Sequence, residues 1–219
     1  MTFSIVACDL EEQAWGVAVA SKFPAVGAVV PWVEAQAGAV ATQSFANTSF
    51  GPRGLALMGT GLSAQETLQR LLEDDPDHEL RQVGLVDAKG GSATFSGSGC
   101  FAWAGGVAGK SYAIQGNILA SERVVSAMEK IFLETEGNLP TRLHAALLAG
   151  DRAGGDRRGR QDVNPRPSMS RNPGLVTAAL WIAGWITAWT TTKTPYRGWE
   201  NCSKCTSCIL ERVRKRTAW

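Results

Sequence analysis

Thr2, which directly follows the initiator Met1, could carry both a nucleophile and its base on one residue. Cells usually remove Met1 when the second residue is small, and threonine is small. Removal would leave a free hydroxyl and a free α-amine on Thr2. An α-amine has a pKa near ~8, so part of it is neutral at pH 7 and can accept the hydroxyl proton. The alternative is that Thr2 is merely the second residue of a chain that starts on a strand.

Several other polar residues are flanked by glycine or by short apolar residues. They are Gln43, Asn47, Arg81, Gln82, Gln115, Asn117 and Asp156. Gly116 separates Gln115 from Asn117, and glycine lets the backbone approach a ligand closely. An amide side chain at such a place could donate a hydrogen bond to a developing oxyanion. Each of these residues could equally be a loop amide or a strand-end residue that bonds to the backbone.

Alternating and short apolar runs predict a series of strands, and longer periodic runs predict helices. The predicted strands cover residues 2–9, 14–21, 26–30, 38–43, 81–87, 92–97 and about 103–107. Helices are predicted from Ser63, where Ser63 and Glu66 fit a capping box, and over residues 121–134 and 139–150. Residues 51–54 are predicted to be a turn. The order is not a repeating βαβ pattern, which favours an α+β fold with mainly antiparallel sheets.

Nine short motifs together resemble a bacterial and archaeal family, domain of unknown function 1028. They are TFSIVA at 2–7, GVAVAS at 16–21, VPW at 30–32, GAVATQ at 38–43, FGPRG at 50–54, RQVG at 81–84, WAG at 103–105, QGN at 115–117 and GDRRGRQ at 155–161. The resemblance covers about residues 2–161. That family is grouped with the N-terminal-nucleophile (Ntn) hydrolases.

The resemblance implies a four-layer αββα sandwich and a site at the start of the first strand. It implies that Thr2 is the nucleophile and, through its amine, the general base. Asn117 is the leading candidate for holding the oxyanion. Ser21, Gln43 and Arg81 are expected next to the substrate, with Asn47 and Gln115 as further polar residues of the site. Lys22 is similar to the lysine that lowers the pKa of threonine in proteasome-type relatives, or else it is a solvated strand end.

Composition changes sharply near residue 160. Residues 1–160 carry 13 Lys and Arg against 17 Asp and Glu, whereas residues 161–219 carry 9 against 3. Five of the eight tryptophans lie in the second part. We therefore expect an Ntn-like domain over 1–160 and an aberrant Trp/Cys-rich basic tail over 161–219, where the sequence departs from the family pattern. Translation of the tail in a wrong reading frame would explain the change.

The tail suggests two other interpretations. Residues 175–189 contain no charge but are too few to span a bilayer comfortably. As a helix they would place Trp181, Trp185 and Trp189 on one face, as in an interfacial anchor. Cys202, Cys205 and Cys208 are spaced like part of an iron–sulfur motif, but they lack a fourth cysteine, and neither histidine lies nearby. Chance spacing explains them better than a membrane-associated metal protein.

These observations predict an amide hydrolase that acts on a small amide or acyl compound through Thr2. We expect no metal or organic cofactor, no nucleic-acid partner and no membrane association. The chain shows no signal peptide, since Asp9, Glu11 and Glu12 interrupt the early apolar residues, so a cytoplasmic location is expected. The sequence leaves open whether the protein forms a homo-oligomer. The main alternative is a non-catalytic ligand-binding or scaffold protein on the same fold.

Overall fold

A computed structural model describes residues 2–23, 25–158, 176–182 and 185–191, the last two ranges as backbone strands only. Ten strands form two sheets. The strands are β1 (Thr2–Asp9), β2 (Ala14–Ser21), β3 (Pro31–Glu34), β4 (Gly38–Ser44), β5 (Arg81–Asp87), β6 (Ser92–Ser96), β7 (Gly105–Gly109), β8 (Tyr112–Asn117), β9 (Val176–Ile182) and β10 (Trp185–Thr191). The helices are α1 (Phe50–Gly59), α2 (Ala64–Glu73), α3 (Arg123–Glu134) and α4 (Leu139–Arg152).

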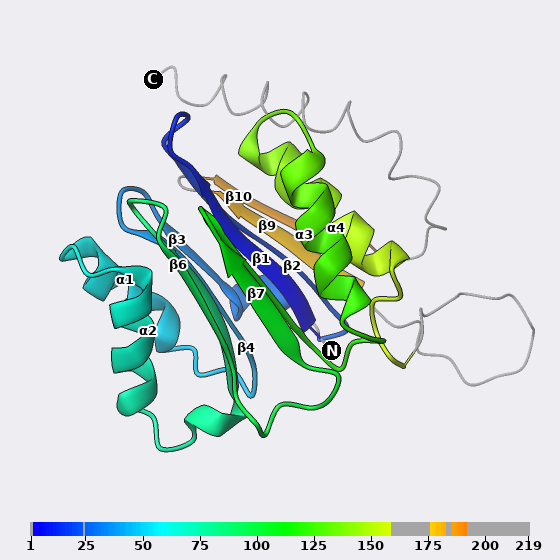
Figure 1. Ribbon diagram of the computed structural model, residues 1–219, viewed down its shortest axis with the longest axis horizontal. Helices are drawn as coiled ribbons and strands as arrows, with labels where there is room; N and C mark the ends of the chain where they lie inside the picture. The colour runs from blue at the N-terminus through cyan, green and yellow to red at the C-terminus, as the bar shows by residue number, and fades with distance from the viewer. Residues whose placement is uncertain (1, 24, 159–175, 183–184, 192–219) are drawn as a thin grey trace, which may run out of the picture. The chain divides into compact units, whose positions relative to one another are not determined.

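The two sheets pack face to face between two pairs of helices (Figure 1). One sheet has the order β10-β9-β2-β1-β8-β7 and the other the order β3-β4-β5-β6. Helices α3 and α4 cover the first sheet, and helices α1 and α2 cover the second. All the pairings described in detail are antiparallel. The predicted αββα sandwich of class α+β is confirmed.

Strand alternation in β1 divides its side chains between two apolar layers. Phe3 and Ile5 belong to the cluster under α3 and α4, whereas Val6 and Cys8 lie in the cluster between the sheets. Successive side chains of a strand point to opposite faces, so Thr2 shares the inter-sheet side with Val6. The first strand therefore places the candidate nucleophile at the end of the layer between the sheets.

Two local predictions were wrong. Residues 26–30 do not form a strand, because Ala25 is left-handed (φ 55°) and Val29 N donates to Val26 O (3.1 Å), which closes a 3₁₀ turn. Residues 51–54 form the first part of α1 instead of a turn. Pro52 is tolerated in a first helical turn because the N–H that proline lacks has no partner there, and Gly51 packs against Trp32 so closely that a Cβ would lie 2.2 Å from the ring.

In the second part of the chain, the secondary structure expected for one segment was wrong. Residues 176–182 are strand β9, which pairs with β2, so the helical interpretation of residues 175–189 is wrong. Tryptophan and β-branched residues favour strands. The compact unit that contains residues 1–160 also contains residues 174–190. Cys202, Cys205 and Cys208 lie outside the described residues. Among the helices that the structure describes, none has the length and apolar character needed to cross a bilayer.

Candidate active site

Three neighbouring strands bring Thr2, Ser21 and Asn117 side by side. Thr2 on the central strand β1 is paired with Ser21 of β2 and with Asn117 of β8. Paired residues point to the same face of a sheet, so all three side chains face the second sheet. Thr2 Oγ1 lies 3.0 Å from Ser21 Oγ, a hydrogen-bonding distance. The Thr2 hydroxyl thus lies between strands that present a hydroxyl on one side and an amide on the other.

A chain of buried amides from the second sheet lies behind these residues. Gln43 Nε2 donates to Gln82 Oε1 (2.8 Å) and makes a long hydrogen bond to the carbonyl oxygen of Thr2 (3.4 Å). Asn117 Nδ2 also donates to Gln82 Oε1, at 2.9 Å. Gln82 itself is anchored through Nε2 to Gly116 O (2.7 Å). The side-chain orientation of Asn117 is therefore fixed from behind, through one of the two N–H bonds of its amide.

Gln115 and Ser4 extend this network along β1 and β8. Gln115 Nε2 donates to Ser4 Oγ (2.6 Å), and Ser4 Oγ donates to Gln43 Oε1 (2.8 Å). Gly84 of β5 makes the room for Gln115, because a Cβ at that position would lie 2.1 Å from Gln115 Oε1. Buried polar groups are stable only when they are hydrogen-bonded. The network therefore joins the two sheets next to Thr2.

Lys22 and Asp156 form an ion pair at the same end of the first sheet. Lys22 directly follows Ser21, and its Nζ lies 3.4 Å from Asp156 Oδ2. Asp156 bridges to Leu119, two residues beyond Asn117. Burial acts to raise the pKa of the Asp156 carboxyl, but hydrogen bonds from Arg158 and the charges of Arg158 and Lys22 outweigh it and hold the pKa below its ordinary value. Lys22 is thus paired with a buried carboxylate beside the site.

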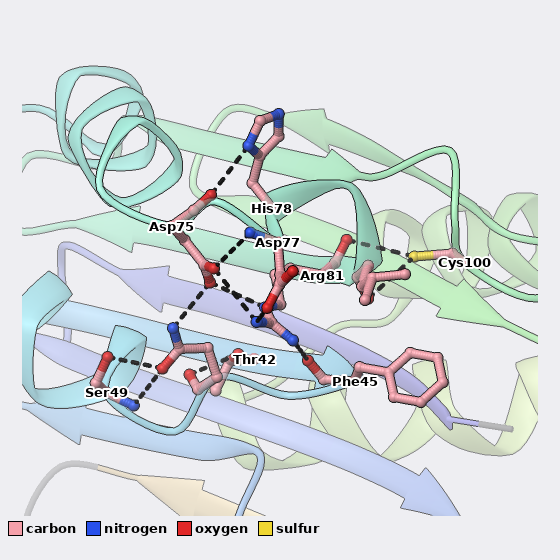
Figure 2. A network of polar contacts seen from close by, with 10 residues as sticks. Thr42, Phe45, Ser49, Asp75, Asp77, His78, Arg81 and Cys100 are labelled. Carbon is pink, nitrogen blue, oxygen red and sulfur yellow. Dashed lines mark hydrogen bonds and ion pairs between the residues drawn. The ribbon is translucent and has the colours of Figure 1, made fainter.

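Arg81 is brought to a different carboxylate, that of Asp75 (Figure 2), and Asn47 binds the same carboxylate. Arg81 Nε donates to Asp75 Oδ2 (2.9 Å), and Asn47 Nδ2 donates to the same oxygen (2.8 Å). The hydrogen bond from Arg81 is the largest cause that holds the pKa of Asp75 low, at about 2. Arg81 Nη1 also donates to Phe45 O (2.8 Å). These contacts hold the chain after β4 in place, and none of them reaches Thr2.

The structure therefore brings together five of the eight predicted site residues: Thr2, Ser21, Gln43, Gln115 and Asn117. Lys22 directly follows Ser21, and Asn47 and Arg81 belong to the Asp75 group. Gln82 and Asp156 were recognised as unusual polar residues but were given no role. Ser4 was missed, although its spacing of two from Thr2 in a strand predicts the same face.

Access to Thr2 is narrow, since 9% of the residue is exposed. Two surface hollows have volumes of about 430 Å³, beside α3 and α4, and about 210 Å³, beside Ser63 and Asp87. Thr2 lines neither of them. Within the described part of the chain, no group of three or more His, Cys, Asp or Glu is placed to hold a metal ion.

Comparison with known proteins found one matching family model and a solved structure with a similar fold. The model of a family of unknown function, DUF1028, matches residues 2–164. The crystal structure of protein SPO2555 from Silicibacter pomeroyi, described as DUF1028, is similar with a TM-score of 0.75 and 24% sequence identity. The similarity covers 100% of this chain and 86% of the other, and it bears on the fold alone. No curated protein matches the chain.

Proposed function

The chain belongs to DUF1028, a family of unknown function, and we propose that it is an Ntn-type hydrolase. In this proposal, removal of Met1 exposes Thr2, which cleaves a small amide or acyl compound. One observation carries the proposal: the Thr2 hydroxyl lies 3.0 Å from Ser21 Oγ on one neighbouring strand and in register with Asn117 on the other. Any buried hydroxyl needs a hydrogen-bond partner, but here an amide that could bind an oxyanion is also in register with the hydroxyl.

The proposed reaction uses groups of the chain alone. The α-amine of Thr2 takes the proton from Oγ1, and the oxygen bonds to the substrate carbonyl carbon. Asn117 Nδ2, which has a second N–H bond beyond the one given to Gln82, stabilises the oxyanion of the tetrahedral intermediate. The amine then passes the proton to the leaving nitrogen as the C–N bond breaks. Water, activated by the same amine, hydrolyses the ester and restores Thr2.

The buried amide network suits this reaction because it is built before the substrate arrives. Gln82 fixes Asn117, and Gln43 fixes Gln82. Donors that need no reorganisation during the reaction contribute most to stabilising a developing charge. The Lys22–Asp156 pair adds two charges at the same end of the sheet, where they can influence the protonation of the Thr2 amine.

The first test compares a blocked and a free amine on the same chain. We would produce the protein with a cleavable leader whose removal leaves Thr2 as the first residue. Hydrolysis of a panel of small amides and N-acyl amino acids should begin only after the leader is removed. A chain carrying Thr2→Ser should retain activity, and Thr2→Ala should lose about a thousandfold or more. Equal activity of Thr2→Ala and wild type would contradict the proposal.

The second candidate is a non-catalytic ligand-binding protein on the same fold. The burial of Thr2 favours it, because the residue is 9% exposed while Met1 is attached. Mass spectrometry of the purified chain separates the two. Retention of Met1 on all molecules would block the amine and favour the non-catalytic candidate, whereas a mass that corresponds to a start at Thr2 supports the hydrolase.

A further inference from the structure

Exposed phenylalanines follow two of the strands that form the candidate site. Phe23 comes two residues after Ser21 of β2, and its backbone N–H donates to Ser21 Oγ (3.0 Å). Phe45 comes two residues after Gln43 of β4. The two residues are 56% and 48% exposed. Large apolar side chains are usually buried, so two exposed aromatic residues so close to one site indicate a role outside the core.

A third exposed phenylalanine comes to the same end of the sheets from a distant segment. Phe101 is 59% exposed, and its carbonyl oxygen accepts a hydrogen bond from Ile118 N (2.9 Å), the residue after Asn117. Its ring packs against that of Phe45, with the ring centroids 5.7 Å apart and the planes tilted by 51°. Leu80, 37% exposed, is also adjacent, since its carbonyl oxygen accepts from Phe45 N (3.4 Å). Phe45 and Phe101 therefore contact each other, and each of the three phenylalanines lies next to a residue of the candidate site in sequence or through a hydrogen bond.

The backbone is strained where the chain leaves these strands. Ser44, directly before Phe45, has φ 69°, and Ile118, directly after Asn117, has φ 55°. Ala25, two residues after Phe23, has φ 55°. Residues other than glycine rarely adopt this left-handed conformation, and such strain persists where the surrounding structure maintains it, often at functional sites. Here it redirects the chain beside the candidate site.

The Asp75 group holds Phe45 in its exposed position. Arg81 donates to the carbonyl oxygen of Phe45 while its other nitrogens bind the Asp75 carboxylate. Figure 2 shows the Phe45 ring on the side of its backbone away from this group. This anchoring explains why Arg81 and Asn47 belong to the site only indirectly: they position the loop that carries Phe45.

We propose that Phe45 and Phe101, together with Phe23, form an aromatic rim that selects substrates with an aromatic ring next to the scissile amide. This proposal rests on the proposed function, because the three phenylalanines follow or adjoin Ser21, Gln43 and Asn117, the neighbours of Thr2. Exposed aromatic rings bind apolar groups both by burial of area and by edge-to-face contact. A methyl group in place of the ring would leave most of that surface in water, so the chain should discriminate between the two.

Two β-lactones with the same reactive ring test the inference, one with a benzyl substituent and one with a methyl substituent. Attack by Thr2 opens the lactone, forms an ester on Thr2, and releases the ring oxygen as a hydroxyl that takes the transferred proton. Intact-mass measurements would give the labelling rate at Thr2. We expect the benzyl compound to react roughly tenfold faster. Phe45→Ala and Phe101→Ala should each lower that ratio about threefold or more, because each removes one face of the rim.

A matched control is Leu133→Ala on α3, which removes a side chain that is 58% exposed at the opposite end of its helix from Asn117. It should leave the ratio unchanged. NMR titrations of the Thr2→Ala chain with N-acetylphenylalanine amide and with N-acetylalanine amide would measure the two affinities. They test the same preference without any reaction. Absence of labelling with a retained binding preference would refute the proposed function but support the rim.

Equal binding of the two compounds would overturn the inference, as would labelling of Thr2 by both lactones at the same rate or a preference that the phenylalanine substitutions do not change. Light scattering decides whether the aromatic residues instead bind a second copy of the protein in a dimer. A wild-type dimer that becomes a monomer with Phe45→Ala, with the benzyl preference intact, would assign these residues to an interface and overturn the rim.

Discussion

At the scale of single residues, the question is what activates a threonine hydroxyl. A hydroxyl is a weak nucleophile until a base accepts its proton. The neighbours of Thr2 offer a hydroxyl at 3.0 Å and a buried amide in register. Among the hydrogen bonds of the described residues, none joins Oγ1 to a histidine or a carboxylate. The base in our proposal is therefore the α-amine of Thr2 itself. Its partner for the oxyanion is Asn117.

Replacement of Asn117 by alanine tests the oxyanion role. We expect kcat to fall by about 10²–10³ with little change in KM, because the lost donor acts mainly on the transition state. Circular dichroism and a thermal melt would check that the fold survives. A matched control is Asn138→Ala, which removes the cap of α4 and should lower stability by about 1 kcal/mol without this loss of kcat. An unchanged kcat for Asn117→Ala would remove Asn117 from the mechanism.

The sequence predicted the positions of some of these residues but not the contacts of others. Ser21 and Gln43 lie next to Thr2 because each is at or near the end of a strand that the apolar runs predicted, whereas Gln115 lies in β8, a strand that was not predicted. Arg81 also starts a strand, but its guanidinium turns toward Asp75. A side chain this long can reach several partners, so its position in the chain does not determine its contact. Gln82, one residue further on, points between the sheets and fixes Asn117.

At the scale of elements, the two sheets approach each other at a glycine. Gly84 of β5 lies against Gln115 of β8, and this contact allows the polar network to cross between the sheets.

Most strand and helix predictions were correct, including the capping box of Ser63 and Glu66, because they depend on local periodicity and caps. The errors at residues 26–30 and 51–54 arose where tertiary packing, such as Trp32 against Gly51, decides the local structure.

Substitution of Gly84 by alanine tests the role of this close approach. The new methyl group would displace Gln115 and disturb its bonds to Ser4. Overpacking of this kind costs about 1–3 kcal/mol, so chemical denaturation should show a less stable protein with lower activity. Gly59→Ala is the control, since its Cβ would meet only Ala37, at 3.8 Å. Equal stability of the two variants would show that the Gly84 contact is not needed.

The Asp75 group gives a prediction of pH dependence. The folded-state pKa of Asp75 is about 2, below the value of 3.8 for the free side chain, so ionised Asp75 stabilises the folded state. That contribution is complete above pH 3.8 and is lost as the pH falls toward 2. Asp75→Asn should remove it, lowering the free energy of unfolding at pH 7 by on the order of 1–2 kcal/mol.

Denaturation measured from pH 7 to pH 2 checks this prediction. The Asp75→Asn variant should differ most from wild type at pH 7 and least near pH 2. Asp77→Asn is the matched control, because Asp77 also contacts Arg81 at 3.4 Å but is 65% exposed, and exposed ion pairs contribute little. A constant difference between Asp75→Asn and wild type at all pH values would contradict the assignment.

At the scale of the whole molecule, the sheet that carries the candidate site includes a strand from beyond residue 160, where the composition changes. Strand β9 pairs with β2 over residues 16–21, and Ser21 of the site lies opposite Thr177. Sequence reasoning set residues 161–219 apart because their charge and tryptophan content differ from those of the rest. Composition reports such a difference, but it does not report which backbone groups pair.

Proline at Ala179 tests whether β9 belongs to the fold in solution. Ala179 lies opposite Val19, inside a strand that has partners on both sides. Proline there removes a ladder hydrogen bond and should cost about 3 kcal/mol or more, whereas Ala179→Gly, which keeps the N–H, should cost about 1 kcal/mol. Thermal melts compare the two. If proline has no effect, residues 161–219 are an appendage, as their composition suggested.

The most direct test of the central claim is to locate the residue that an electrophile modifies. The purified chain would be treated with the benzyl β-lactone, digested, and mapped by tandem mass spectrometry. The account predicts a single adduct on a peptide that begins at Thr2, and no adduct in the Thr2→Ala chain. An adduct elsewhere, or labelling of Thr2→Ala at the wild-type rate, would contradict it.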